Sequence, residues 1–198
     1  MRLNIYLTGG VGGQGLVTFA TVLGDAAIRA GYKALVAETH GLSQRGGGSV
    51  DVHVRIGDID APLIPRGGGA DVIVAFEIIE AFRAVDYANE DTVFIVNRRL
   101  IRPPMIKQKI PSINELENLL RKNIRKLYVV DAYSDAAKLG GNIIYENTII
   151  LGALYSILRL NQYIPQGVIE ESIKMNLRRD IDKNLRAFTI GLKYGNAK

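Results

Sequence analysis

Two short glycine-rich segments of this 198-residue chain contain residue types that could bind an anionic ligand. The first, TGGVGGQGLVT, has the spacing G-x-G-x-x-G at Gly10, Gly12 and Gly15, with Gly13 and Gln14 between them. Glycines permit positive φ and let the main chain approach a ligand closely. The N-terminus of a following helix would add unpaired N–H groups and a partial positive charge, which suit a phosphate.

The same segment also fits a dinucleotide-binding turn. It follows the apolar run LNIYL, and Glu38 lies about 20 residues beyond Gly15, the spacing expected for an acid that binds a ribose. No Lys-Ser/Thr pair closes the segment, which argues against a nucleotide-hydrolase P-loop. A free-standing NAD(P)-binding oxidoreductase stays open as one alternative. It would need a second, substrate-binding domain, which this chain lacks. A purely structural interaction subunit is another alternative.

The second segment, THGLSQRGGGS, is dense in polar residues that a plain dinucleotide fold does not need. It contains His40, Ser43, Gln44, Arg45, Gly46, Gly47 and Gly48. Arg45 could contact a phosphate or a carboxylate through its planar guanidinium, and Gln44, like Gln14, could make neutral hydrogen bonds. His40 could titrate near neutrality. A lone histidine beside glycines is more often a hydrogen-bonded loop residue, so we assign it no catalytic role.

Short apolar strands alternate with helices along the rest of the chain. We expect strands at residues 3–7, 33–38, 49–57, 69–77, 91–97 and 127–132. We expect helices from Gly12 to about Ala30 with Gly31 as the stop, after residue 77, after a Ser112 capping box, and over most of the chain beyond residue 144. This pattern predicts an α/β fold with three layers, α/β/α. The sheet would be Rossmann-like and mostly parallel, followed by C-terminal helices, with residues 1–198 as a single domain.

The strand at residues 49–57 alternates strictly between apolar and polar side chains. Val50, Val52, Val54 and Ile56 share one face, and Asp51, His53 and Arg55 share the other. This alternation predicts a strand with one wet or partner-facing side, with His53 at an interface or at the surface. The loop before the strand is too short for a crossover helix, so the strand should be antiparallel to its neighbours. Two weaker site candidates are the strand-terminal residues Glu77 and Asn97, for which capping is an equally good interpretation.

The amino-acid composition excludes some classes of function and disfavours others. The absence of cysteine excludes disulfides and cysteine-ligated iron–sulfur clusters or zinc on this chain. The net charge is +5, and residues 98–126 are basic, but no nucleic-acid motif accompanies the charge, so a solvated surface is favoured over nucleic-acid binding. No signal peptide or bilayer-length apolar run is present, so we expect a cytoplasmic protein with no membrane partner. Many Ile, Arg and Lys residues would suit a thermophile.

Several segments together resemble one known family. They are GVGGQG…T, AETHGLSQRGG…VDVHVRIGD, APLIP, GADVIVAFE, VNRR…PP and ENTIILGAL. They are similar to the small, gamma-type subunit of the 2-oxoacid:ferredoxin oxidoreductases, and within that family to the subunits of the indolepyruvate enzymes. The resemblance covers nearly the whole chain. One departure is the run Gly46, Gly47 and Gly48, where the family pattern has two glycines.

The resemblance implies a reaction and a partner. The reaction is the oxidative decarboxylation of a 2-oxoacid such as indolepyruvate or pyruvate, with coenzyme A accepting the acyl group and ferredoxin the electrons. A large partner subunit would carry thiamine diphosphate, magnesium and iron–sulfur clusters. This chain would then contribute no catalytic residue and no metal ligand, and would bind no cofactor alone. Both glycine segments would meet at the carboxyl end of the sheet, dock on the partner and share coenzyme A.

Overall fold

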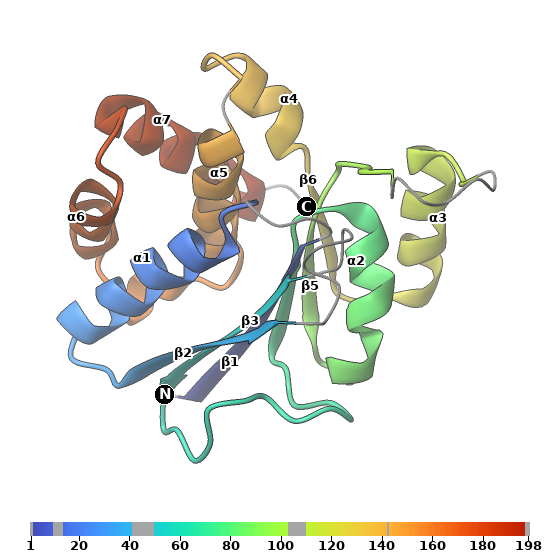
Figure 1. Ribbon diagram of the computed structural model, residues 1–198, viewed down its shortest axis with the longest axis horizontal. Helices are drawn as coiled ribbons and strands as arrows, with labels where there is room; N and C mark the ends of the chain where they lie inside the picture. Colours follow the sequence, from blue (N-terminus) through green and yellow to red (C-terminus); the bar gives the residue numbers. More distant parts are fainter. Residues whose placement is uncertain (1, 10–13, 41–49, 103–109, 142, 197–198) are drawn as a thin grey trace.

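The computed structural model describes residues 2–9, 14–40, 50–102, 110–141 and 143–196, and the structural statements below concern these residues. A six-stranded sheet lies between two layers of helices (Figure 1). The strands are β1 (Arg2–Gly9), β2 (Ala34–His40), β3 (Val50–Gly57), β4 (Val72–Ala75), β5 (Val93–Asn97) and β6 (Leu127–Val130). The α-helices are α1 (Leu16–Arg29), α2 (Ile78–Arg83), α3 (Ile113–Asn123), α4 (Ala132–Ala137), α5 (Ile143–Ile157), α6 (Gln166–Asn176) and α7 (Ile181–Leu192). Short 3-10 helices are η2 (Ala84–Tyr87), η3 (Leu160–Gln162) and η4 (Lys193–Asn196).

The strand order is β2-β3-β1-β4-β5-β6. Strands β1, β4, β5 and β6 pair in parallel, whereas β3 is antiparallel to both β1 and β2. The predicted α/β class, the mostly parallel direction of the strands and the reversed strand are therefore confirmed. Gly9 ends β1 and His40 ends β2 at the edge where Val50 begins β3. We call this side of the sheet the carboxyl edge, and both glycine segments depart from it.

Each face of the sheet has its own apolar core. On one face, Ile5, Leu7 and Val54 pack with buried residues of α1, α5 and α7. On the other face, Ile73 and Phe94 pack with buried residues of α2 and α3. The two helical layers are visible on either side of the sheet in Figure 1. The alternation of side chains along each strand is what places apolar residues on both faces.

Helix α1 begins at Leu16, four residues later than the predicted start at Gly12. Gly15 precedes the helix with φ +78°, a left-handed conformation through which a right-handed helix cannot run. The predicted stop at Gly31 agrees with the structure, since Gly31 has φ +87° and its N–H bonds the carbonyl of Ile28 at 2.9 Å. The glycine spacing located the turn but not the residue at which the helix starts.

The predicted C-terminal helices are present, and α5 and α7 cross very closely. A Cβ on Gly152 would collide with the carbonyl oxygen of Phe188, and a Cβ on Gly191 would collide with that of Ile149. Glycine at both positions is what lets the two helix backbones approach. Helix α4 was not predicted. None of the helices in the described part of the chain has the length and apolar character needed to cross a membrane.

The polar face of β3 is not wet, so that prediction was wrong. His53 is 2% exposed and Arg55 is 1% exposed. The segment after β3 folds back over them: the N–H of Ile64 donates to His53 Nδ1 at 3.1 Å, and Arg55 Nη1 donates to the carbonyl of Ala61 at 2.6 Å. Arg55 also forms an ion pair with Asp60 at 2.6 Å. Burial lowers the pKa of His53, so this imidazole is neutral and structural.

Part of the basic region is paired with acidic residues of the chain. Ser112 and Glu115 form the predicted capping box at the start of α3. Further along this helix, Glu117 accepts from Arg98 and from Arg121, each at 2.9 Å. These pairs agree with the interpretation of a solvated surface; the pairing itself was not predicted.

Candidate functional site

The structure describes only part of the predicted site. Gln14 and Gly15 are described, and for His40 the main chain is described at the end of β2, opposite Val50. The other predicted site residues, Gly10, Gly12, Gly13, Ser43, Gln44, Arg45, Gly46 and Gly47, lie outside the described residues. Their roles stay predictions. The described part of the predicted site consists of the strand and helix ends at the carboxyl edge of the sheet.

Gly15 is held by a side chain from a distant helix. A Cβ on Gly15 would collide with the amide nitrogen Nδ2 of Asn147 in α5. Together with its left-handed φ, this contact leaves room only for glycine. Asn147 itself is 8% exposed. The end of the first glycine segment is thus fixed by a residue that lies far along the sequence, in the C-terminal part of the chain.

Gln14 is a buried residue between β1 and α1. Its side chain is buried, with the residue 2% exposed, and its Oε1 lies over Gly9 at the end of β1. A Cβ on Gly9 would stand 2.7 Å from that oxygen. Gln14 already has an interaction within the chain. The buried side chain therefore lies against the end of β1, and its direct contact with a ligand stays a prediction.

The N-terminus of α1 suits an anion. Its N-cap, Gly15, offers no side-chain hydrogen bond, and the first turn contains no acidic residue. The first N–H groups of a helix have no intrahelical acceptor, and the helix dipole is positive at this end. The uncapped end of this 14-residue helix faces the carboxyl edge, where phosphate groups commonly bind in such folds.

Asn97, at the end of β5, has a buried acceptor without a donor. Its Nδ2 donates to the carbonyl of Phe76 at 3.3 Å and to Glu146 Oε2 at 3.2 Å. Both neighbours are acceptors when Glu146 is ionised, which fixes the orientation of the amide. Oδ1 has no hydrogen-bond partner in the described part of the chain, although Asn97 is only 1% exposed. Buried acceptors are rarely unpaired, so this oxygen is a candidate acceptor for an N–H or O–H group that the described residues do not supply.

Arg99 is fixed beside Asn97 by the same carboxylate. Its Nη1 donates to Glu146 Oε1 at 2.7 Å, and its guanidinium lies 5.2 Å from the ring centre of Tyr133. The Arg99 side chain is 25% exposed, whereas the Glu146 side chain is 7% exposed. A cation, partly open to solvent, is therefore held in place by the same carboxylate that accepts from Asn97 Nδ2.

Glu77 caps a helix, which agrees with the interpretation of this residue as a cap; its alternative interpretation as a site residue stays a prediction. Its Oε1 accepts the N–H of Glu80 at 2.8 Å at the start of α2, and the residue is 1% exposed. Burial raises the pKa of Glu77 to about 7, and the negative charge of nearby Glu80 adds to the rise, while bonds from main-chain N–H groups oppose it. Glu80 in turn accepts from the Thr8 hydroxyl at 3.2 Å. Two buried carboxyl groups thus support the end of β1 and the start of α2.

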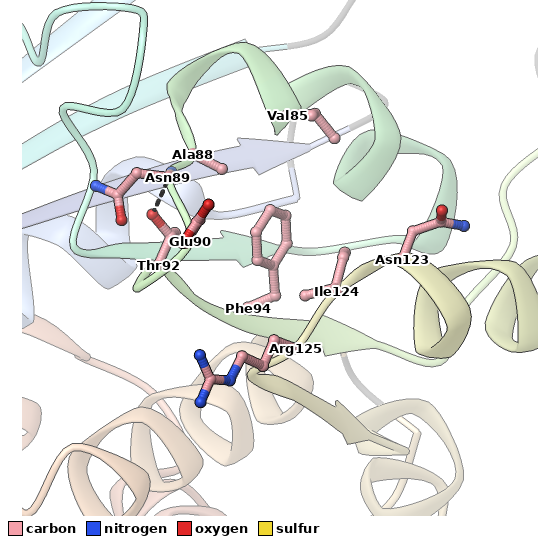
Figure 2. Close-up of a pocket in the computed structure, with 9 residues that line it drawn as sticks. All are labelled: Val85, Ala88, Asn89, Glu90, Thr92, Phe94, Asn123, Ile124 and Arg125. Carbon is pink, nitrogen blue, oxygen red and sulfur yellow. Dashed lines mark hydrogen bonds between the residues drawn. The ribbon is translucent and has the colours of Figure 1, made fainter.

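A separate hollow lies at the opposite, amino edge of the sheet. It has a volume of about 390 Å³ and is bordered by Phe94, Ile124 and Val85, near the start of β5 (Figure 2). In the same hollow the N–H of Asn89 donates to Thr92 Oγ1 at 2.8 Å. None of the predicted site residues is among its lining residues. Among the described residues no cluster of His, Asp or Glu could hold a metal ion.

Comparison with known proteins identifies the family. The family described as pyruvate ferredoxin/flavodoxin oxidoreductase matches residues 5–194. The chain belongs to this family. Indolepyruvate oxidoreductase subunit IorB of Archaeoglobus fulgidus is 42% identical over 197 residues, which covers 96% of this chain and 94% of the relative. The relatives include thermophilic archaeal proteins, which agrees with the composition.

Solved structures of the family share the fold. Pyruvate oxidoreductase subunit PORC from Thermotoga maritima is 25% identical, with a TM-score of 0.69 over 97% of this chain and 96% of that chain. The chain also superposes on the 2-oxoglutarate:ferredoxin oxidoreductase from Magnetococcus marinus with a TM-score of 0.72 and 20% identity. The superposition covers 100% of this chain and 31% of that longer chain. The family membership predicted from the sequence is therefore confirmed. The chain is a small, gamma-type subunit within the oxidoreductase family and is similar to IorB.

The family segment ENTIILGAL explains the residues that sequence reasoning missed. Its first three residues lie in the first two turns of α5 and contact three different parts of the molecule. Glu146 bonds the end of β5, Asn147 contacts Gly15, and Thr148 donates to Asn184 of α7 at 2.8 Å. Polar residues at the start of an otherwise apolar helix were the available signal, and they went unused because helix prediction weighs periodicity more than individual polar side chains.

Proposed function

We propose that this chain is the small subunit of an indolepyruvate-type 2-oxoacid:ferredoxin oxidoreductase. The observation that carries the proposal is the 42% identity to IorB over nearly the whole of both chains. A large partner subunit would hold thiamine diphosphate, magnesium and the iron–sulfur clusters. The absence of cysteine from this chain supports that division. The enzyme would act in the cytoplasm, with ferredoxin reduced by the partner.

The bound thiamine diphosphate of the partner would supply the decarboxylation chemistry, with coenzyme A accepting the acyl group. The role of this chain would be to complete the active site and to help hold coenzyme A. The uncapped N-terminus of α1 and the guanidinium of Arg99 fit phosphate groups, and Asn97 Oδ1 fits an N–H or O–H donor. All three groups lie at the carboxyl edge, the first beside the end of β1 and the other two at the end of β5.

Co-purification from the native cell tests the proposal. We expect a large subunit with iron–sulfur absorption to accompany this chain, and the complex to reduce ferredoxin with indolepyruvate only when coenzyme A is present. Pyruvate serves as the comparison substrate. A chain that purifies alone, or a complex whose ferredoxin reduction does not depend on coenzyme A, would contradict it.

Arg45 tests the part assigned to the second glycine segment. If Arg45 contacts a coenzyme A phosphate, Arg45→Ala loses a hydrogen bond to a charged group. The binding free energy of coenzyme A should then weaken by about 1.5–3 kcal/mol while the complex stays assembled. Arg45→Lys should rescue only partly, because the two-pronged geometry is lost. Arg178→Ala, at an exposed position between α6 and α7, is the matched control. Dissociation of the complex on gel filtration would instead indicate a carboxylate on the partner, and an unchanged KM for coenzyme A in an assembled Arg45→Ala enzyme would remove Arg45 from the site.

A further inference from the structure

The outer strand β6 has an unpaired edge. On its inner side, the N–H of Phe94 donates to the carbonyl of Lys126 at 2.8 Å, and the N–H of Arg98 donates to the carbonyl of Val130 at 2.7 Å. Residues of a strand turn their main-chain groups alternately to one side and to the other. The even-numbered residues of β6 therefore bond β5, and the odd-numbered ones face outward.

The outward-facing residues are Leu127 and Val129. Their main-chain N–H groups have no hydrogen-bond partner within the described ranges, and neither residue is fully buried. Beyond them the outward N–H of Asp131 is already taken by the hydroxyl of Tyr194, at 3.2 Å. The edge is thus closed at its carboxyl end and free along β6. Free edges of this kind pair readily with another strand unless they are covered.

A cationic hollow runs along this free edge. A hollow of about 410 Å³ is bordered by Leu127, Tyr128 and Val129, with Arg121, Arg125, Lys126 and Tyr194 around it. A second hollow of about 370 Å³ shares Tyr194 and is bordered by Lys138 and Lys193.

The border of these hollows carries an excess of positive charge. Asp135 is the acidic residue at the border, and it is already paired with Lys138 at 2.7 Å and with the hydroxyl of Tyr194 at 2.8 Å. Arg121 and Lys126 each have an ion-pair partner at 2.7 and 2.8 Å. Arg125 is exposed, and its side chain forms no ion pair or hydrogen bond within the described part of the chain, although its charge acts at longer range on Asp91, which is already paired with Lys126. The free charge therefore favours an acidic occupant.

We propose that β6 is a docking edge, which takes an extended acidic segment of the large subunit as a further strand of the sheet. The inference rests on the proposed function, since it assigns the occupant to that subunit. Main-chain bonds to Leu127 and Val129 form the ladder, and Arg125 pairs with a carboxylate of the segment. The hydroxyl of Tyr194 marks where the added strand ends.

Hydrogen–deuterium exchange of the assembled complex, compared with the full chain alone, tests the ladder residue by residue. The amides of Leu127 and Val129 become protected on assembly. Those of Tyr128 and Val130, which bond β5, are protected in both samples and serve as internal controls. Unchanged exchange at Leu127 and Val129 would overturn the proposal. So would protection that arises in the chain alone at high concentration, because the occupant would then be a second copy.

Two pairs of variants separate the ladder from the charge. Val129→Pro removes an outward N–H and leaves the bonds to β5, and it should weaken binding of the large subunit about tenfold. Val129→Thr keeps the N–H and is its control. Arg125→Glu should weaken binding about fivefold, more at low salt than at high salt. Lys122→Glu, exposed on α3 and outside both hollows, is its control.

The outcomes of these experiments distinguish a failure of the docking edge from a failure of the proposed function. A folded Val129→Pro chain that binds the large subunit as the wild type does would overturn the docking edge and leave the proposed function intact. Circular dichroism of the variant establishes that it is folded. A wild-type chain that binds no large subunit would overturn the proposed function, and the docking edge with it.

Discussion

Replacing Gly15 by alanine should destabilise the chain through two separable effects. The first is backbone strain, because φ is +78°, and holding an L-residue there costs about 1–2 kcal/mol. The second is overlap of the new Cβ with Asn147 Nδ2, and overpacking of this kind costs about 1–3 kcal/mol. The free energy of unfolding of Gly15→Ala should therefore fall by roughly 2–5 kcal/mol, the sum of these ranges.

Gly31 is a matched control for the strain alone. It has φ +87°, and a Cβ there would meet nothing within 4 Å. Gly31→Ala should therefore lose only about 1–2 kcal/mol. A double-mutant cycle with Asn147→Ala isolates the overlap, because Asn147→Ala removes the atom that the Cβ introduced by Gly15→Ala would strike, without relieving the strain. We expect Gly15→Ala and Asn147→Ala to couple by about 1–3 kcal/mol.

Urea unfolding of the full chain, followed by circular dichroism, measures all of these free energies. In the assembled enzyme, Gly15→Ala should also raise the KM for coenzyme A, because the loop before α1 must shift to admit the Cβ. Equal destabilisation by Gly15→Ala and Gly31→Ala, together with no coupling to Asn147, would refute the contact between α5 and the glycine segment. Full stability of Gly15→Ala would refute the left-handed turn itself.

Three further predictions concern a carboxyl group, a helix crossing and the dinucleotide alternative. The folded pKa of Glu77, about 7, lies above its usual 4.5, so the contribution of Glu77 to stability is greatest below pH 4.5 and falls by about 3 kcal/mol as the pH rises to about 7. Glu77→Gln should remove this contribution and so flatten the dependence of the unfolding free energy on pH between these values in urea unfolding. Gly152→Ala should lower the free energy of unfolding by about 1–3 kcal/mol in the same assay. Gly167→Ala, at a position with open space around it, should leave that free energy unchanged or raise it. The isolated chain should not bind NAD or NADP in calorimetry, and micromolar binding that Glu38→Ala removes would revive the dehydrogenase.

The sheet could be predicted because its causes are local in sequence. Apolar runs, turn glycines and the capping box at Ser112 each specify their element without help from distant residues. The reversal of β3 followed from loop length alone, since the loop from β2 cannot hold a crossover helix. These are the elements for which prediction and structure agree.

The errors arose where distant segments decide the outcome. Strict alternation in β3 predicted a wet face, but periodicity does not tell which later segment will cover it. Residues 58–64 bury His53 and Arg55 by accepting and donating specific hydrogen bonds. The network of Asn97, Arg99 and Glu146 joins residues about 50 positions apart, so no local pattern announced it. Only the family resemblance had marked the segment that supplies Glu146.

The three contacts at the start of α5 have a consequence for how the molecule opens. Successive residues of a helix project in directions about 100° apart, so Glu146, Asn147 and Thr148 reach the sheet, the glycine segment and α7 from one rigid turn. A rotation or fraying of that turn breaks all three contacts at once. The carboxyl edge and the C-terminal helices should therefore open as a single cooperative unit, with one free energy of local unfolding. Gly15 and the start of α1 would then be as stable as the helical layer behind them.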